Sequence, residues 1–313
     1  MGGADLVFFE GNNSWSMAAA RLAEKLPSHF AVDGLTADNH AIIILREEEL
    51  GRFSGHAFRG HWRCYPCSLV KTFHLVHALA EMESGRLMPQ AELDRAMRDM
   101  IVWSSNTATN YVIDLLTGTT GDTLLNGRNF SDWVAARERL NRWFEALDWP
   151  EMSGINLTQK LMDDMRYGRE AQFAALNGGY LNVLTPIAAA RLMAAIFSGE
   201  LPLSSAALAR AQKTLLRDPS GSDAANPNFQ LSEFLGGQMP GGVRIWSKAG
   251  HNLWTGDPDS SWFKHDMIRL KAPGQKPLIF VLMTQGKRLA EEVPDAFPRI
   301  GRFLFDELGG DSK

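Results

Sequence analysis

The sequence predicts an α+β protein, with an antiparallel sheet built from both chain ends, flanking helices and an inserted all-α subdomain. Strand-like apolar patterns occur near both ends of the chain, at 41–58 and 242–285, and helical patterns fill the residues between them. We therefore expect a sheet subdomain of residues 1–62 and 216–313 and a helical subdomain of residues 63–215, which together form one unit.

The first part of the chain predicts a helix, a hairpin and a second helix. Residues 14–26 (SWSMAAARLAEKL) have the period of an amphipathic helix, with one of their serines as the cap. The apolar runs 41–45 and 51–58 are typical of strands, and the charged break REEELG between them indicates a hairpin. The helix that follows is expected to end near Gly85.

The middle of the chain is predicted to be helical. Thr185 and Pro186 form a characteristic helix start, a cap followed by proline at the first helical position. The linkers 117–130 and 148–184 are long, polar and rich in Gly and Asn, and long loops in compact domains often carry function. The expected helices lie at 90–103, 106–116, 131–147, 187–198 and 204–215.

The last third of the chain is predicted to form strands and a final helix. Residues 242–250, 260–270 and 277–285 have strand patterns, and APGQKP is a turn signal between the last two. A closing helix is expected at 289–308. The strands at both chain ends can then pair in one sheet.

Composition excludes several classes of protein. The chain has 313 residues, a net charge of −4 and no run of five basic residues, which argues against nucleic acid as a partner. Its longest apolar stretches, such as Pro277–Met283, are too short to span a membrane. Residues 1–30 lack a basic start followed by an apolar run. We therefore expect a cytoplasmic protein, or a periplasmic one if a signal was removed; the oligomeric state stays open.

The stretch CYPCSLVKTFHLVHAL places Ser68 and Lys71 three residues apart at the start of a helix. At that spacing both side chains share one face, so the amine can reach the hydroxyl. A serine becomes a nucleophile only with a base nearby, and a lysine can serve if its surroundings lower its pKa. Ser68 is therefore a candidate nucleophile and Lys71 its base.

Two further motifs follow in the chain. WSSNTATN (103–110) places Ser104 and Asn106 where two helical patterns meet. The hydroxyl could relay a proton, and the carboxamide could hold a substrate amide or orient the lysine. WSKAGHN (246–252) ends a strand, where Lys248 supplies a positive charge and Gly250 would allow a substrate backbone to approach closely.

The three motifs, S-x-x-K, S-x-N and K-x-G, together resemble the signature set of serine β-lactamases and penicillin-binding proteins. The local sequence is most similar to class A β-lactamases. WSSNTATN resembles their S-D-N-T-A-A-N, with Ser105 where Asp is usual, and WSKAG resembles K-T-G, with Ala249 in place of Thr. The segments 184–193 and 272–286 also resemble this family. The resemblance implies a β-lactamase/DD-peptidase-like fold.

The resemblance also implies roles for individual residues. Ser68 would be the acylated nucleophile, Lys71 its base and Ser104 the proton relay to the leaving group. Substrate would be bound by Asn106, by Lys248 as the anchor for a carboxylate, and by Gly250 and His251. The backbone N–H groups of Ser68 and His251 would form the oxyanion hole, and no cofactor is required.

Deacylation is where the sequence departs from this family. Class A enzymes use a glutamate in an E-x-x-L-N pattern on the Ω-loop, and no such pattern occurs here. Glu170 is the best candidate by its spacing from Pro186, and Asp163 and Asp164 are weaker ones. The aspartate that usually clasps this loop falls near Asn182, which cannot form that ion pair.

The sequence thus predicts a serine hydrolase of class A β-lactamase type that forms an acyl-enzyme with a small-molecule amide, lactam or ester. The alternatives are a penicillin-binding DD-peptidase-like protein, a glutaminase-type amidase and a catalytically impaired binding protein. The departures from the motifs and the reshaped linkers argue against an antibiotic-resistance enzyme.

Two rival kinds of site are disfavoured. Cys64 and Cys67 form C-x-x-C, but the βαβ context of redox motifs is absent, so we expect packed thiols. His74 and His77 lie three apart on an apolar helix without a third ligand nearby in sequence, so we expect packed histidines and no metal.

Overall fold

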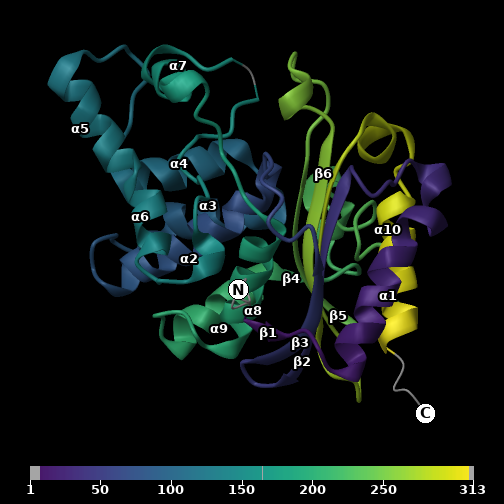
Figure 1. Ribbon diagram of the computed structural model, residues 1–313. Helices are drawn as coiled ribbons and strands as arrows, with labels where there is room; N and C mark the ends of the chain where they lie inside the picture. The colour runs from purple at the N-terminus through teal and green to yellow at the C-terminus, as the bar shows by residue number, and fades with distance from the viewer. Residues whose placement is uncertain (1–7, 164, 310–313) are drawn as a thin grey trace, which may run out of the picture.

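The computed structural model describes residues 8–163 and 165–309, and its centre is one mixed seven-stranded sheet (Figure 1). The strand order is β1-β3-β2-β7-β6-β5-β4, and every neighbouring pair is antiparallel except β1–β3. The predicted sheet from both chain ends is confirmed. The strands are β1 (Phe9–Glu10), β2 (His40–Glu49), β3 (Arg52–Phe58), β4 (Leu216–Arg217), β5 (Arg244–His251), β6 (Phe263–Lys271) and β7 (Leu278–Gln285).

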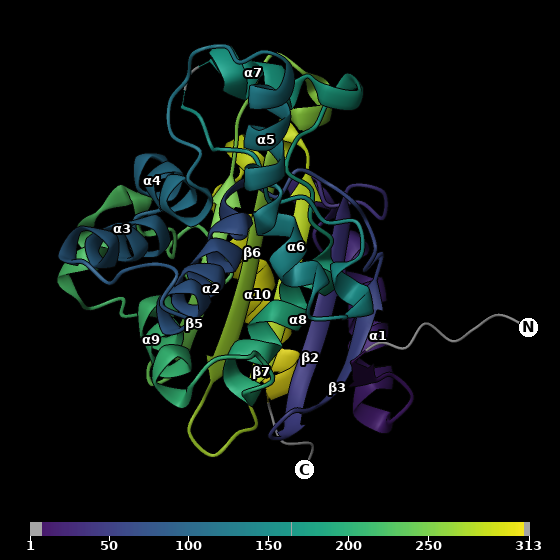
Figure 2. The same ribbon diagram turned by 90° about the vertical axis from the view of Figure 1, so that its left-hand side faces the viewer.

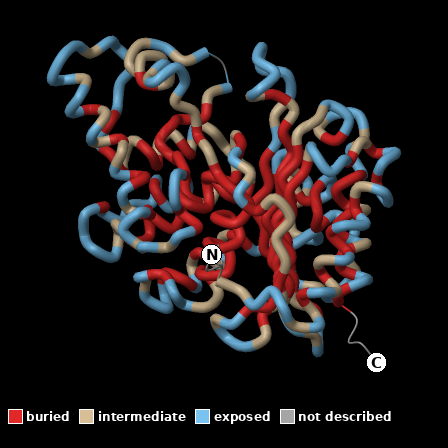
Figure 3. Tube along the Cα trace, in the orientation of Figure 1, coloured by how far each residue is buried: buried red, intermediate tan, exposed pale blue. Residues whose placement is uncertain are grey.

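Both faces of the sheet are buried, which explains the continuous apolar runs in its strands (Figure 3). Successive side chains of a strand point to opposite faces. Along β2, Ile43 and Leu45 therefore join the apolar cluster under the helical part, while Ile42 and Ile44 join the cluster under the terminal helices. Each face needs its own cover of helices.

Helices supply that cover on both sides (Figures 1 and 2). α1 (Ser14–His29) and α10 (Ala296–Gly309) contact each other on one face. On the other face, α8 (Pro186–Ser198) packs directly on β2, β6 and β7, with α2 (Val70–Glu83) in the same apolar cluster. Because α8 lies on the sheet, the division into two subdomains stays a prediction.

The remaining helices are α3 (Ala91–Val102), α4 (Asn106–Thr117), α5 (Gly127–Arg137), α6 (Arg139–Glu145), α7 (Gly168–Ala174) and α9 (Ser205–Leu215). The predicted start of α8 is confirmed, since the Thr185 hydroxyl accepts the N–H of Ala188. The single helix predicted at 131–147 is instead two, α5 and α6, which meet at Glu138. The other expected helices of the middle region are present.

One predicted cap and one predicted helix start were wrong for local reasons. α1 is capped by Asn13, whose side chain accepts the N–H of Ser16 at 2.9 Å, and not by one of its serines. The closing helix begins at Ala296, because Pro294 disfavours helical geometry at Val293 and a short π-helical turn precedes it.

None of the helices in residues 8–163 and 165–309 combines the length and apolarity needed to cross a lipid bilayer.

Candidate active site

Ser68 lies in a 3₁₀ turn, Cys67–Leu69, that leads directly into α2. The residue before it, Cys67, has a left-handed backbone with φ of 49°, which is costly for a residue with a side chain. Gly250 of β5 lies against this turn: a Cβ atom there would be 2.4 Å from the backbone nitrogen of Ser68. The glycine thus lets β5 approach the serine itself, while its predicted contact with a substrate backbone stays a prediction.

His265 of β6 fixes the segment before the serine. Its Nε2 atom lies 2.9 Å from the Tyr65 carbonyl oxygen, and its Nδ1 atom accepts the N–H of Thr284 at 3.1 Å. These contacts require a neutral ring with the proton on Nε2. Burial lowers the pKa of His265 to about 4, which keeps the ring in that form. Sequence reasoning missed this residue, although a histidine inside an apolar strand was a signal.

Lys71 is fully buried and bound to three oxygen atoms. Its Nζ atom donates to the Ser104 carbonyl at 2.5 Å, to Ser104 Oγ at 3.1 Å and to Asn106 Oδ1 at 2.8 Å. Burial lowers its pKa to about 7, against a smaller opposing effect of the Asp163 charge. A neutral amine that can accept a proton is therefore available near neutral pH.

Ser104 joins the two lysines of the motifs. It has a left-handed backbone, with φ of 54°, and its hydroxyl also lies 3.0 Å from Lys248 Nζ. Lys248 is fully buried and further donates to Gln230 Oε1 at 2.7 Å and the Ala249 carbonyl at 2.5 Å. Burial and the nearby Lys71 charge hold the pKa of Lys248 well below its usual value. One hydroxyl thus lies between two amines, and burial disfavours the charged form of both.

Arg217 of β4 connects the two parts of this cluster. Its guanidinium donates to the carbonyl oxygens of Ile101 and Val102 at the end of α3 and to that of Ser247 beside Lys248. The arginine is buried, so these bonds form in a medium of low dielectric constant. It holds the strand that carries Lys248 against the turn that carries Ser104, and sequence reasoning missed it.

Asn106 connects Lys71 to an acidic residue. Its Oδ1 atom accepts from Lys71, and its Nδ2 atom donates to Asp163 Oδ1 at 2.5 Å. Asp163, a weaker candidate in the sequence, is therefore bonded into the cluster. Asp164, the other weaker candidate, lies outside the described residues.

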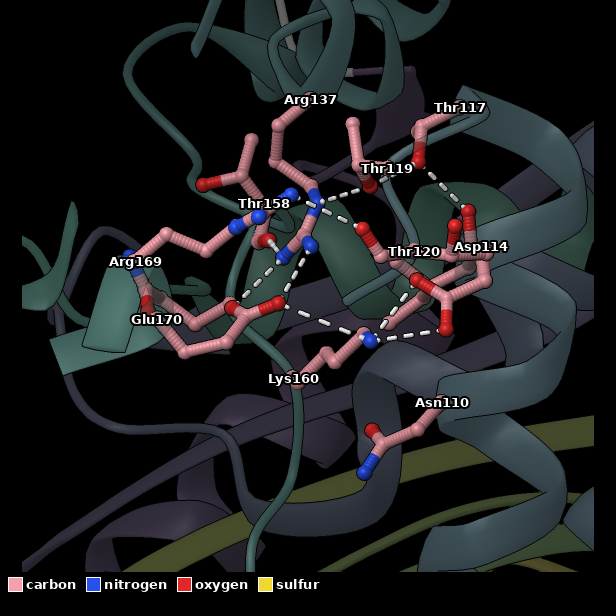
Figure 4. Close-up of polar contacts among 12 residues, drawn as sticks. Asn110, Asp114, Thr117, Thr119, Thr120, Arg137, Thr158, Lys160, Arg169 and Glu170 are labelled. Atoms are coloured by element: carbon pink, nitrogen blue, oxygen red, sulfur yellow. Dashed lines mark hydrogen bonds and ion pairs between the residues drawn. The ribbon is translucent and has the colours of Figure 1, made fainter. Parts of the chain in front are cut away.

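Glu170 lies elsewhere, in a buried cluster of charges (Figure 4). Arg137 of α5 binds both of its carboxylate oxygens, at 2.6 and 3.1 Å, and Lys160 lies 3.5 Å from one of them. Lys160 in turn pairs with Asp114 of α4 at 2.7 Å. Both oxygens of Glu170 are thus occupied by cations in the interior. Glu170, the residue predicted to be the deacylating base, is therefore held by Arg137, which its spacing from Pro186 does not reveal.

Asn182, the residue where the family's clasping aspartate would fall, forms a different clasp. Its Oδ1 atom accepts the N–H of Gln159, and its Nδ2 atom donates to the carbonyl of the same residue, both at 2.9 Å. Its side-chain amide thus binds the backbone N–H and carbonyl of Gln159, as the backbone of a neighbouring strand would. The loop is held by this pair and by the Arg137–Glu170 pair.

A pocket of about 270 Å³ opens beside the serine. Ser68, Asn106 and His251 line it, whereas Lys71, Ser104, Lys248 and Gly250 do not. The Lys248 amine, predicted to anchor a substrate carboxylate, is enclosed and already bound to three oxygen atoms, so that role stays a prediction. The full lining is Tyr65, Cys67, Ser68, Asn106, Leu161, Met162, Arg166, Leu181, His251, Asn252, Thr255 and Ser260.

The two cysteines before α2 and the two histidines of α2 are packed in the core. Cys64 and Cys67 are free and buried, and burial raises the pKa of both thiols, which disfavours the reactive thiolate. Burial lowers the pKa of His74 to about 3 and that of His77 to about 4. In the described part of the chain, no three His, Cys, Asp or Glu residues gather as a metal site.

Known proteins share this fold and part of the sequence. The model of the beta-lactamase enzyme family matches residues 88–308. Comparison with curated protein sequences gives no match.

Solved structures of class A β-lactamases and other β-lactamases are similar over most of the chain. A mutant of the class A β-lactamase of the last common ancestor of Gram-negative bacteria has 19% identity and a TM-score of 0.59, covering 91% of this chain and 97% of that one. A β-lactamase from Burkholderia vietnamiensis has 16% identity and a TM-score of 0.60, covering 96% and 98%. One from Chitinophaga pinensis has 15% identity and a TM-score of 0.63, covering 91% and 98%. The predicted fold is confirmed.

The contact between Gly250 and Ser68 can be tested by Gly250→Ala. The added methyl group would lie 2.4 Å from the serine nitrogen, so one of the two backbones must move. We expect a loss of about 1–3 kcal/mol in unfolding free energy and roughly 100-fold slower labelling of Ser68 by a fluorophosphonate. Gly241→Ala is the control, since no heavy atom lies within 4 Å of its Cβ position. Equal stability and labelling of the two variants would contradict the contact.

Proposed function

Because this chain belongs to the beta-lactamase enzyme family, we propose that it is a serine hydrolase that opens an amide, lactam or ester through an acyl-enzyme on Ser68. The observation that carries the proposal is the Ser104 hydroxyl, which lies between the buried amines of Lys71 and Lys248, behind a pocket lined by Ser68. This arrangement supplies a nucleophile, a neutral base and a proton relay in one place.

Acylation proceeds in two steps. Ser68 Oγ attacks the substrate carbonyl carbon while its proton passes to the neutral Lys71 amine. The carbonyl oxygen becomes an oxyanion, which the backbone N–H groups of Ser68 and His251 stabilise; Gly250 brings the two segments together. The bond from carbon to the leaving nitrogen or oxygen then breaks. The leaving atom takes a proton from Ser104, which regains one from a protonated lysine.

Deacylation requires a base for water, and we assign this role to Asp163. Its carboxylate is exposed and hydrogen-bonded to Asn106, which also binds Lys71. Water attacks the ester carbon, its proton passes to Asp163, and the bond from carbon to Ser68 Oγ breaks to release the acid. Ser68 Oγ takes up the proton that Asp163 gained from the water, so that the serine hydroxyl, the neutral Lys71 amine and the Asp163 carboxylate are all restored.

The proposal is tested by the mass of the protein after incubation with penicillin, nitrocefin, p-nitrophenyl esters and simple amides. Lactams belong in the panel because the similar solved structures are named β-lactamases. We expect an acyl adduct on a peptide containing Ser68, and Ser68→Ala should remove both adduct and turnover. A persistent adduct with penicillin alone would favour a DD-peptidase-like protein, and ammonia release a glutaminase-type amidase. Absence of any adduct, including one from a fluorophosphonate, would leave the binding-protein alternative.

The pKa of Lys71 predicts the pH dependence of acylation. Only the neutral amine accepts a proton, and its pKa is about 7. We expect the acylation rate to fall about tenfold per pH unit below pH 7 and to reach a plateau above it. Stopped-flow measurement of the burst phase checks this profile. A rate that is unchanged between pH 5 and pH 8 would contradict a lysine base of this pKa.

The substitutions Asp163→Asn and Glu170→Gln distinguish the roles of the two carboxylates. We expect Asp163→Asn to acylate normally but to deacylate about 100-fold or more slowly, so that the adduct accumulates. Glu170→Gln leaves the Arg137 charge buried without its partner and should lose roughly 3–5 kcal/mol of unfolding free energy. Rapid-quench mass spectrometry and urea unfolding give the two readouts. Adduct accumulation in Glu170→Gln but not in Asp163→Asn would reverse the assignment.

A further inference from the structure

We infer that Arg166 selects anionic substrates, by binding a carboxylate or another negatively charged group of the molecule whose acyl group is transferred to Ser68. This inference rests on the proposed function, because it concerns the same pocket. It places the substrate anchor on the segment before α7, and not on β5 with Lys248.

The charge of the pocket lining supports this assignment. Among its described residues, Arg166 is the one that carries a permanent charge, and no Asp or Glu lines it. The other titratable base is His251, whose pKa is lowered by desolvation of the ring and by the nearby Lys264 and Lys248 charges. At neutral pH the lining residues therefore carry one positive charge, on Arg166, whereas the Asp163 carboxylate lies outside this lining and is bonded to Asn106. A positive charge in the lining itself favours an anion.

Arg166 also has binding capacity that the fold leaves unused. Its Nε atom is buried and has no hydrogen-bond partner among residues 8–163 and 165–309. Its charge lies close enough to Tyr65, another lining residue, to lower the pKa of that phenol against the larger effect of burial. A buried N–H without a partner is unfavourable, and an anionic ligand would satisfy it with a charged hydrogen bond.

Other basic and polar groups nearby are already engaged. The Lys248 amine binds three oxygen atoms, and the guanidinium of Arg217 binds the carbonyls of Ile101, Val102 and Ser247.

The polar groups elsewhere in the lining are engaged too. Asn252 donates to the Ser260 carbonyl and accepts the N–H of Phe263, while the hydroxyls of Thr255 and Ser260 bond each other at 2.8 Å. Arg166 thus brings a buried Nε–H group without a partner to the lining, and its planar group suits a carboxylate.

The test compares two activated aryl esters whose acyl chains are identical except for a terminal carboxylate in one and a carboxamide in the other. We expect wild type to prefer the carboxylate ester. Arg166→Gln should lose about ten- to 100-fold in kcat/KM for that ester and change by less than about twofold for the carboxamide. Arg166→Lys should keep part of the preference, and added salt should weaken it. Arg128→Gln is the control, since it removes the same charge from an arginine with a side chain that is 91% exposed.

A second measurement keeps this inference separate from the proposed function. In the Ser68→Ala background, calorimetry with the unreactive amides of the same two acids reports binding without acylation. Preference for the carboxylate that disappears in Ser68→Ala/Arg166→Gln supports the anchor even if wild type forms no adduct. Equal binding of the two amides, or equal losses on both esters in Arg166→Gln, would overturn it while leaving the Ser68 adduct as evidence for the hydrolase.

Discussion

The site depends on one constraint: two lysine amines must be buried on either side of a single serine hydroxyl. Burial disfavours their charged forms, and each amine compensates with three oxygen partners. Those partners come from the turn at Ser104, from Asn106, from Gln230 and from the strand that carries Lys248. The left-handed backbone at Ser104 and the buried guanidinium of Arg217 keep these segments together, so several costly features of the fold serve the same cluster.

Burial of Lys71 lowers the stability of the folded protein but gives an amine that can accept a proton near neutral pH. In the unfolded chain Lys71 would hold its proton up to about pH 10.4, whereas in the fold its pKa is about 7. Between these values the unfolded state binds more protons, so the contribution of this group to stability rises with pH. Below pH 7 the full penalty of a buried charge remains. Above pH 7 the buried amine loses its charge, so the free-energy cost of burying that charge falls. In the same pH range the neutral amine can act as a base.

The sequence predicted what is local and missed what depends on contacts between distant segments. Period and cap signals were enough for most helices and for the main strands. Three short motifs singled out Ser68, Lys71 and Ser104, of which the structure brings Lys71 and Ser104 into contact. His265 and Tyr65 are 200 residues apart, and no pattern in either segment indicates their contact. The contacts of Glu170 were missed for the same reason: its spacing from Pro186 is typical of the family, but Arg137 of α5 binds its carboxylate.

In the loop before α8, the side chains that hold the loop are different from those that we propose act on water and on substrate charge. Glu170 with Arg137, and Asn182 with Gln159, hold the loop through buried contacts. Asn110 adds a third pair, because its amide bonds both the N–H and the carbonyl of Leu161. Asp163 and Arg166 fall between Leu161 and Glu170 in the chain, so the anchors position the groups that we propose act on water and on substrate charge. The contacts that hold the loop involve side chains other than Asp163 and Arg166. Substitutions at these two positions can therefore change the chemistry of the site without breaking the contacts that position the loop.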